Sequence, residues 1–264
     1  MFNLREADQA TPEAPVHRAD LVEVELASKA VPRISIDELA DELRGDPTDV
    51  SDEEEATGDR SRWEIAREAA EDAFKELRWR SGWLGNHYPV QFDGGESVIW
   101  DAESASSELY RFLVLLRAKQ LARGSMEGGT PSPGHLFEEL LTQATNAYVK
   151  DGQAIRFGLG AYGTRGGGLP ASLPDAVDDL AKRMHETAGD NPSGKHGDYG
   201  GDAIAWRPFG DRRAGQLVLI AQGTISQADW QTKEIPRKWQ DGRGRVIKLV
   251  AYPVQAVGFV ESMS

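Results

Sequence analysis

Residues 200–223 read GGDAIAWRPFGDRRAGQLVLIAQG. Two apolar runs, over residues 202–209 and 216–223, are separated by a Gly- and Arg-rich stretch that is typical of a turn. This pattern predicts a β-hairpin in which Asp202 begins the first strand and Gln222 ends the second. Because neighbouring strands bring opposite side chains close together, we expect the Asp202 carboxylate and the Gln222 amide to converge.

Further helical and strand signals surround this hairpin and predict an α/β domain over residues 134–264. Apolar residues recur at helical spacing on both sides of the hairpin, and Gly-rich stretches separate the elements. The elements expected beyond the hairpin are helices over residues 135–150 and 173–187, a helix that starts near residue 228, and a strand over residues 246–254.

The preceding part of the chain is predicted to form a separate, mainly helical domain over residues 21–124, for assembly or partner binding. Residues 124–134, GSMEGGTPSPG, are typical of a linker. Residues 1–20 lack periodicity and are predicted to be a disordered tail. The elements expected between them are a short strand or extended segment over residues 21–26, a helix opened by a Ser35–Glu38 capping box, and helices over residues 62–79 and 106–123, the last one buried.

Composition excludes several classes of protein. The chain has 264 residues and no cysteine, which excludes disulfides, thiolate metal sites and cysteine nucleophiles. Its first residues lack the basic and apolar regions of a secretory signal, and no apolar run approaches the roughly 20 residues that span a bilayer. We therefore expect a soluble cytoplasmic protein with no membrane contact.

Charge is unevenly distributed along the chain. The net charge is -13, and residues 1–60 hold 17 acidic against 6 basic side chains. Residues 233–248 carry the opposite bias, with six basic and two acidic side chains. A protein that grips nucleic acid across its whole surface is therefore excluded, whereas a basic strip beside a site is not.

The hairpin carries the chemistry that the sequence indicates most strongly. Hard cations such as Mg²⁺ prefer carboxylate and amide oxygens, which Asp202 and Gln222 supply. Lys233 begins the basic segment after the second strand, and a nearby lysine can orient an attacking water or stabilise charge on a phosphate. No P-loop or dinucleotide fingerprint is present, and the five histidines have no metal-ligand spacing.

This hairpin resembles the core of the PD-(D/E)xK, or restriction-endonuclease-like, nuclease superfamily. In that pattern an Asp opens one strand, and a Glu or Gln, any residue and then a Lys close the next. The helix HLFEELLTQATNAY, residues 135–148, is similar to the helix that precedes the family's hairpin and often supplies another acid, here Glu138 or Glu139. The resemblance covers about residues 134–254.

The resemblance implies a central mixed sheet flanked by helices, and Mg²⁺- or Mn²⁺-dependent hydrolysis of phosphodiester bonds in DNA. Asp202 and Gln222, with Glu138 or Glu139, would hold the metal, and Lys233 would assist the water. The resemblance also implies a prokaryotic restriction or anti-phage defence setting. There the chain would work in a homo- or hetero-oligomer, beside an ATPase, helicase or sensor subunit.

One residue departs from the family pattern. Thr224 stands two residues after Gln222, where the lysine is expected, and Lys233 of the following helix is the candidate to replace it. The alternative is a catalytically degenerate scaffold that binds a partner protein through its acidic N-terminal half. In that alternative Asp202 caps a turn, Gln222 satisfies backbone groups, and the acids of residues 138 and 139 favour the start of a helix.

Overall fold

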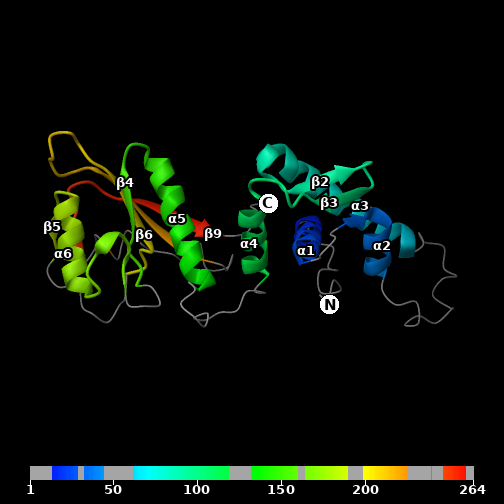
Figure 1. The fold of residues 1–264 in the computed structure, drawn as a ribbon, viewed down its shortest axis with the longest axis horizontal. Helices are drawn as coiled ribbons and strands as arrows, with labels where there is room; N and C mark the ends of the chain where they lie inside the picture. The colour runs from blue at the N-terminus through cyan, green and yellow to red at the C-terminus, as the bar shows by residue number, and fades with distance from the viewer. Residues whose placement is uncertain are drawn as a thin grey trace. The chain divides into compact units, whose positions relative to one another are not determined.

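The computed structural model describes residues 14–28, 33–44, 62–118, 132–159, 164–189, 199–224, 239 and 246–259. These residues form a mixed α/β structure with six α-helices and three sheets (Figure 1). The chain divides into two compact units, unit 1 (Met1–Gln120 with Ser262–Ser264) and unit 2 (Leu121–Glu261). None of the helices within the described ranges has the length and apolar character needed to cross a membrane.

Unit 1 combines four helices with a three-stranded antiparallel sheet of order β1-β3-β2. Its elements are α1 (Ala14–Ser28), β1 (Arg33–Ser35), α2 (Ile36–Arg44), α3 (Arg62–Leu84), the short 3-10 helix η4 (Gly85–His87), β2 (Val90–Asp93), β3 (Ser97–Trp100) and α4 (Ser107–Arg117). Helix α3 forms the centre of the core, because Ala70, Phe74 and Leu77 are completely buried. Burying such side chains away from water is what holds the helices and the sheet together.

The capping box predicted at the start of α2 is confirmed by its hydrogen bonds. The Ser35 backbone N–H donates to Glu38 Oε2 at 2.7 Å, and the Glu38 backbone N–H donates to Ser35 Oγ at 3.1 Å. These bonds satisfy donors that the first turn of a helix leaves without a partner. The capping box therefore marks this helix start in the sequence, and a hydrogen bond from the Ile36 N–H to the Glu96 carbonyl at 2.9 Å adds a long-range contact there.

Helix α1 corrects two predictions. Residues 21–26 are helical, so the predicted strand is wrong, and residues 14–20 are helical rather than disordered. Residues 1–13 of the predicted tail lie outside the described residues. The alternation of LVEVEL suggested a strand because glutamates were taken to face solvent, but Glu23 is as buried as Val22 and Val24. Because Glu23 faces the core, the alternation of apolar and acidic residues does not correspond to alternating buried and exposed faces, and the strand prediction depended on that correspondence.

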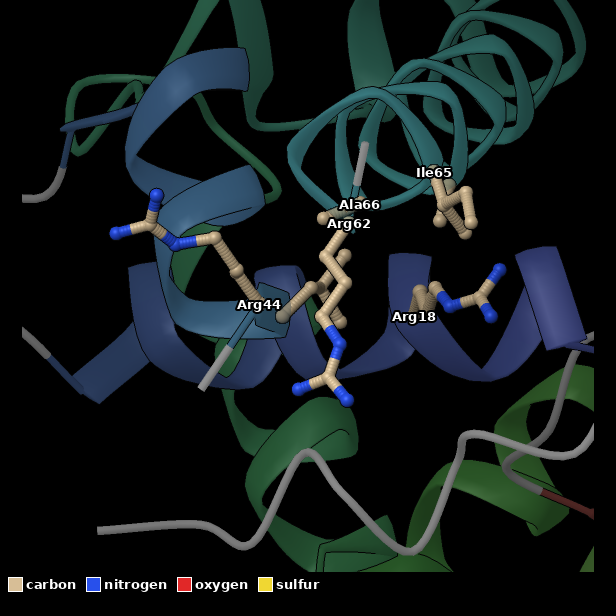
Figure 2. A pocket seen from close by; sticks show the side chains of 7 residues that line it. Arg18, Arg44, Arg62, Ile65 and Ala66 are labelled. Carbon is tan, nitrogen blue, oxygen red and sulfur yellow. The ribbon is translucent and has the colours of Figure 1, made fainter. Parts of the chain in front are cut away.

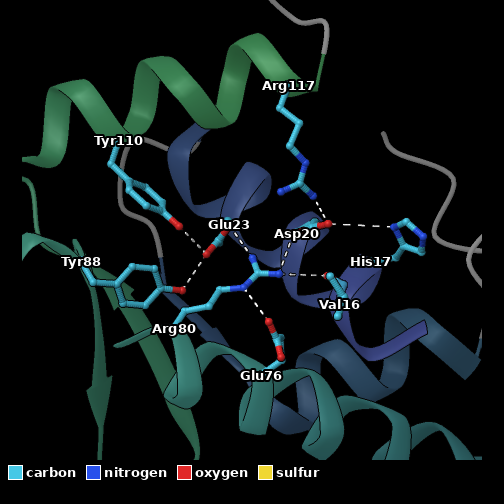
Figure 3. A network of polar contacts seen from close by, with 9 residues as sticks. All are labelled: Val16, His17, Asp20, Glu23, Glu76, Arg80, Tyr88, Tyr110 and Arg117. Carbon is cyan, nitrogen blue, oxygen red and sulfur yellow. Dashed lines mark hydrogen bonds and ion pairs between the residues drawn. The ribbon is translucent and has the colours of Figure 1, made fainter. Parts of the chain in front are cut away.

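A buried charged network explains why Glu23 faces the core (Figure 3). Glu23 is 1% exposed and Arg80, on α3, is 4% exposed. Arg80 Nη1 donates to Glu23 Oε2 at 2.8 Å. The hydroxyls of Tyr88 and Tyr110 both donate to Glu23 Oε1, at 2.7 and 2.8 Å. The carboxylate is thus held by three donors from three other elements, as a buried charge requires.

The same arginine extends the network to two further carboxylates. Arg80 forms ion pairs with Asp20 at 2.8 Å and with Glu76 at 2.9 Å, and Arg117 of α4 also pairs with Asp20. Burial, and next the charge of Glu23, raise the pKa of Tyr88 and of Tyr110 far above the ordinary tyrosine value. Both phenols therefore remain protonated and act as donors.

Helix α4 is less buried than its sequence indicated. The prediction was one buried helix over residues 106–123, and the structure has α4 over Ser107–Arg117. Within it only Ser107, Val114 and Leu116 are buried, while Leu109 is 46% exposed. Residues 119–123 lie outside the described part of the chain.

Unit 2 is built on a four-stranded mixed sheet of order β4-β6-β7-β9. The β4–β6 and β6–β7 pairs are antiparallel, and the β7–β9 pair is parallel. The elements are α5 (Pro133–Val149), β4 (Gln153–Arg156), the 3-10 helix η5 (Gly166–Gly168), α6 (Leu173–Arg183), β5 (Thr187–Ala188), β6 (Ala203–Arg207), β7 (Leu217–Thr224), β8 (Ile247–Lys248) and β9 (Val254–Phe259). Strands β5 and β8 form a separate two-stranded sheet.

The two faces of the mixed sheet carry different side chains and different helices (Figure 1). Large residues, among them Ile204, Trp206 and Ile220, pack with α6. The residues between them in β6 and β7, mostly alanines, pack with α5. Close approach of α5 also requires Gly223, where an added Cβ would lie 2.9 Å from the Phe137 ring. The predicted hairpin is confirmed, and alternation along its strands sets the two layers.

Two predictions at the edges of the domain need correction. A single last strand was expected over residues 246–254, but the chain forms β8 in the two-stranded sheet with β5 and then β9 in the four-stranded sheet beside β7. Strand β4 lies in a stretch for which no strand was expected. The helix expected near residue 228 lies outside the described residues, except for Trp239, whose fully buried ring meets Phe157 edge-on.

Candidate functional site

The hairpin places Asp202 and Gln222 at the same end of the mixed sheet. Ala203 pairs with Ala221, and the Asp202 backbone N–H donates to the Ala221 carbonyl at 2.9 Å. The register of the two strands begins at the Ala203–Ala221 pair, so Asp202 and Gln222 lie just beyond this pair, on neighbouring segments at the same end of the sheet. Both residues are half-buried, so a ligand from solvent has access to their oxygens.

The backbone around Asp202 is fixed from two sides. The Asp202 carbonyl accepts hydrogen bonds from the N–H groups of Phe157 at 2.8 Å and Gly158 at 3.2 Å. The Asp202 Oδ2 atom accepts from the Gly223 N–H at 2.7 Å. The last bond is the kind of contact expected if Asp202 only caps the turn before β6 and does not bind a metal. It does not exhaust the carboxylate, whose two oxygens offer about four acceptor sites.

A glycine turn approaches the Gln222 amide. Gly200 has a φ of +77°, and an added Cβ there would lie 3.4 Å from both Nε2 and Oε1 of Gln222. The following residue, Gly201, packs against the buried Trp239 in the same way, at 3.0 Å. This turn places backbone directly beside the amide, which a larger residue at either position would push away.

The two candidate acids of α5 lie next to Arg156 of β4. Arg156 is buried, and its Nη1 lies 3.5 Å from Glu138 Oε2, while its Nε lies 3.8 Å from Glu139 Oε2. An added Cβ at Gly158 would be 3.0 Å from Glu138 Oε2. Since the Gly158 N–H donates to the Asp202 carbonyl, Glu138 lies near the Asp202 end of the sheet. Glu138 thus lies near Asp202, and it is also an ion-pair partner of Arg156.

His135 completes this polar cluster. Arg156 Nη1 lies 3.2 Å from His135 Nδ1, and because a guanidinium can only donate, Nδ1 must be the acceptor. Partial burial, and next the charge of Arg156, lower the pKa of His135. The imidazole is therefore neutral at pH 7 and carries its proton on Nε2.

Arg156 and His135 were not assigned to the site from the sequence. Arg156 was only one of several arginines that could contact a phosphate, and strand β4 was not expected there. The histidine at the start of α5 had no metal-ligand spacing. One local signal was available, since Glu138 and Glu139 follow His135 by three and four residues and share its helix face.

Lys233 and the residues around it lie outside the described residues, so the prediction that it assists catalysis stays a prediction. Thr224, at the position of the family's lysine, ends β7 and is buried. Among the described residues no group of three or more His, Asp or Glu side chains is placed to hold a metal ion. Asp202 and Gln222 lie at one end of the hairpin, and Glu138 and Glu139 both lie close to Arg156.

Comparison with known proteins identified no relative of this chain. No family model, curated protein or solved structure matches the chain.

Proposed function

We propose that unit 2 is a metal-dependent nuclease that hydrolyses phosphodiester bonds of DNA. The observation that carries the proposal is the position of Asp202 and Gln222, both half-buried, at the same end of the β6–β7 hairpin. Carboxylate and amide oxygens are the donors that Mg²⁺ or Mn²⁺ would take. The succession α5, β4, β6, β7 and β9, with a mixed sheet between helices, supports a restriction-endonuclease-like core.

The surrounding residues would supply the remaining functions. A bound Mg²⁺ would act as a Lewis acid and lower the pKa of a bound water. Glu138 would join Asp202 and Gln222 as a metal ligand, and to do so it would give up its ion pair with Arg156. Glu139 is the alternative ligand. The guanidinium of Arg156 would then be released to contact a phosphate oxygen, for which its geometry is suited. Lys233 stays the candidate to orient the water.

A plasmid-nicking assay with Mg²⁺ or Mn²⁺ tests this proposal. The variant Asp202→Asn keeps an oxygen that can accept from the Gly223 N–H but removes the charge that a metal needs. Asp211→Asn is the matched control, because this exposed carboxylate lies in the hairpin turn and pairs at the surface with its neighbour Arg213. We expect the parent and Asp211→Asn to nick supercoiled DNA, and Asp202→Asn and Lys233→Ala to fail.

The second candidate function is a degenerate scaffold that binds a partner protein, such as an ATPase or sensor subunit. The buried Thr224 at the lysine position favours it. In that case the parent would cleave neither DNA nor RNA with either metal, and Mg²⁺ or Mn²⁺ would not raise the melting temperature. A ligand that binds only the folded state must raise it, so the two candidates give opposite results.

A further inference from the structure

The hydrogen bonds of Arg156, on β4, all lie on one side of its guanidinium group. Nη1 donates to His135 Nδ1 at 3.2 Å and to the Gly158 carbonyl at 3.4 Å, and it lies 3.5 Å from Glu138 Oε2. The other edge of the planar group carries the N–H donors of Nε and Nη2. These two donors point in parallel, which suits the paired oxygens of a phosphate or a carboxylate.

The Nε–Nη2 edge lacks a hydrogen-bond acceptor among the described residues. Arg156 is only 6% exposed, and its Nε is buried without a hydrogen-bond partner. A buried donor without an acceptor costs free energy, which a ligand oxygen would recover. Since Nη1 is anchored to His135 and Gly158, the guanidinium is already oriented for such a ligand.

Glu139 is the acid that faces this edge. Its Oε2 atom lies 3.8 Å from Arg156 Nε, which is within ion-pair range and beyond hydrogen-bond distance. The Glu139 side chain is 49% exposed, so water is an alternative partner for its carboxylate. Exposed ion pairs of this kind contribute little free energy. A phosphate that offers both its oxygens to Nε and Nη2 can therefore displace Glu139.

Gly158 joins this cluster to the Asp202 end of the sheet. Its N–H donates to the Asp202 carbonyl at 3.2 Å, and its carbonyl accepts from Arg156 Nη1 at 3.4 Å. A phosphate on Arg156 would therefore belong to the part of a substrate that lies near Asp202.

The arginines of unit 1 do not meet the same conditions. Figure 2 shows a hollow between α1, α2 and α3 that is lined by Arg18, Arg44 and Arg62. Arg44 and Arg62 are exposed to water, and Arg62 has an interaction within the chain. Residues 45–61, between these two arginines in the sequence, lie outside the described part of the chain. Nothing in that hollow therefore calls for a ligand.

We propose that the Nε–Nη2 edge of Arg156 binds a phosphate group of DNA, with His135 as the residue that positions the guanidinium. Glu139 is then a competing carboxylate that the phosphate displaces, and Glu138 is the acid of α5 that remains for the metal. The identity of the ligand as DNA rests on the proposed nuclease function, whereas the phosphate site itself does not.

Fluorescence anisotropy of a short labelled DNA duplex, titrated with the full chain in EDTA, measures binding without cleavage. Glu139→Gln should tighten binding by about threefold, because the competing charge is removed. Asp175→Asn is the control, because it removes the same charge from the exposed start of α6. Arg156→Lys keeps the positive charge but loses the fork of two donors, and it should weaken binding by about tenfold. Inorganic pyrophosphate should compete with the duplex for the parent and not for Arg156→Lys.

Two variants of His135 test its positioning role. His135→Phe keeps a ring but removes the acceptor for Nη1, and it should weaken binding several-fold. His135→Asn offers a side-chain oxygen to the same donor and should restore most of the lost affinity. A loss that is equal in both variants would show that His135 acts only through packing, which would overturn its positioning role.

The phosphate site is overturned if neither the parent nor Glu139→Gln binds the duplex. An equal gain in Asp175→Asn would also overturn it, because net charge alone would then explain the effect. In the nicking assay with Mg²⁺, loss of cleavage in Glu139→Gln would make Glu139 a metal ligand and refute its role as a competitor. If the expected binding changes occur but the parent never nicks DNA, the nuclease function fails and the phosphate site stands.

Discussion

The two polar clusters of this protein differ in how completely their charges are satisfied. In unit 1, Glu23 is 1% exposed and accepts three hydrogen bonds of 2.7–2.8 Å from Arg80 and two tyrosines. In unit 2, Asp202 and Gln222 are half-buried, and the contact between Glu138 and Arg156 is 3.5 Å long. The first cluster has the properties of a structural support, and the second has those of a site whose partners can be exchanged.

The physical reason for this difference is the cost of removing charge from water. A buried carboxylate survives only when every acceptor site that has lost water finds a donor. Such a group cannot release its partners to bind a ligand without a large penalty. A half-exposed carboxylate keeps water as an alternative partner, so exchange with a metal ion is inexpensive. Burial of a charged group therefore does not identify it as functional. A carboxylate whose acceptor sites are only partly filled by protein donors is the better candidate.

The largest expected effect comes from breaking the unit 1 network. Arg80→Met should lower the free energy of unfolding by about 3–5 kcal/mol, because it leaves Glu23 buried without its cation. Urea denaturation followed by tryptophan fluorescence measures this change. The control Arg33→Met removes an arginine whose ion pair with Asp93 is half-exposed on both sides, and it should cost less than about 1 kcal/mol.

A double variant sharpens that result. Glu23→Leu combined with Arg80→Met removes both buried charges, so it should be clearly more stable than the sum of the two single losses predicts. Additive losses would contradict the idea that the penalty comes from an unpaired charge.

The next largest effect is expected in unit 2. Asp202→Asn should reduce metal-dependent nicking by at least about 100-fold, since removal of a charged metal ligand removes transition-state stabilisation. The midpoint of urea unfolding should shift little, because an amide oxygen still accepts from the Gly223 N–H. If the two clusters were alike, this variant would unfold as Arg80→Met does.

The pH dependence of stability tests the tyrosines of the network. The pKa of Tyr88 and of Tyr110 is raised in the folded protein, so only the unfolded state releases these protons just above pH 10. The folded state then binds more protons than the unfolded state, and stability falls as the pH rises. The expected slope is about 1.4 kcal/mol per pH unit for each tyrosine.

The double variant Tyr88→Phe/Tyr110→Phe isolates that contribution. Its unfolding free energy should be lower near pH 8, where each lost hydroxyl leaves Glu23 with one donor fewer. Between about pH 10 and 12 it should fall less steeply than that of the parent. Parallel curves for the two proteins would show that other groups cause the alkaline loss.

The smallest expected effect comes from moving one acid without removing any chemical group. In Gly158→Ala the new Cβ would lie 3.0 Å from Glu138 Oε2, so the carboxylate must shift by a few tenths of an ångström. We expect a several-fold loss of nicking, with wild-type stability within about 1 kcal/mol. Gly134→Ala, at a position with nothing within 4 Å of the new Cβ, is the control. Unchanged nicking would remove Glu138 from the site.

Local signals in the sequence were sufficient for part of this structure. The hairpin, the start of α2 and the helices α5 and α6 depend on alternation, capping and spacing within a few residues, and these were predicted close to their observed bounds. The hairpin places Asp202 and Gln222 at the same end of the sheet, and the convergence of their side chains stays a prediction. The family assignment and the roles of Lys233 and Glu138 stay predictions.

What the sequence did not reveal depends on distant partners. Glu23 is buried only because Arg80, Tyr88 and Tyr110 reach it from elements far along the chain. No local rule marks a glutamate as a core residue, so residues 21–26 of α1 were mistaken for a short strand or extended segment. Similarly, Arg156 reaches Glu138 and His135 only after β4 pairs with β6, a long-range contact that periodicity cannot predict.

The parallel pairing of β7 with β9 has a consequence for the order of folding. Gln222 pairs with Val257, whereas its hairpin partners lie on the adjacent β6. Closing a short hairpin costs little chain entropy, but closing the parallel pair joins residues that are far apart in sequence. The β6–β7 hairpin can therefore form early, and β9 joins the sheet later. In a hydrogen-exchange experiment, the amides of β9 should exchange faster than those of β6. During folding, this end of the sheet is then supported first by the hairpin and only later by β9 as well.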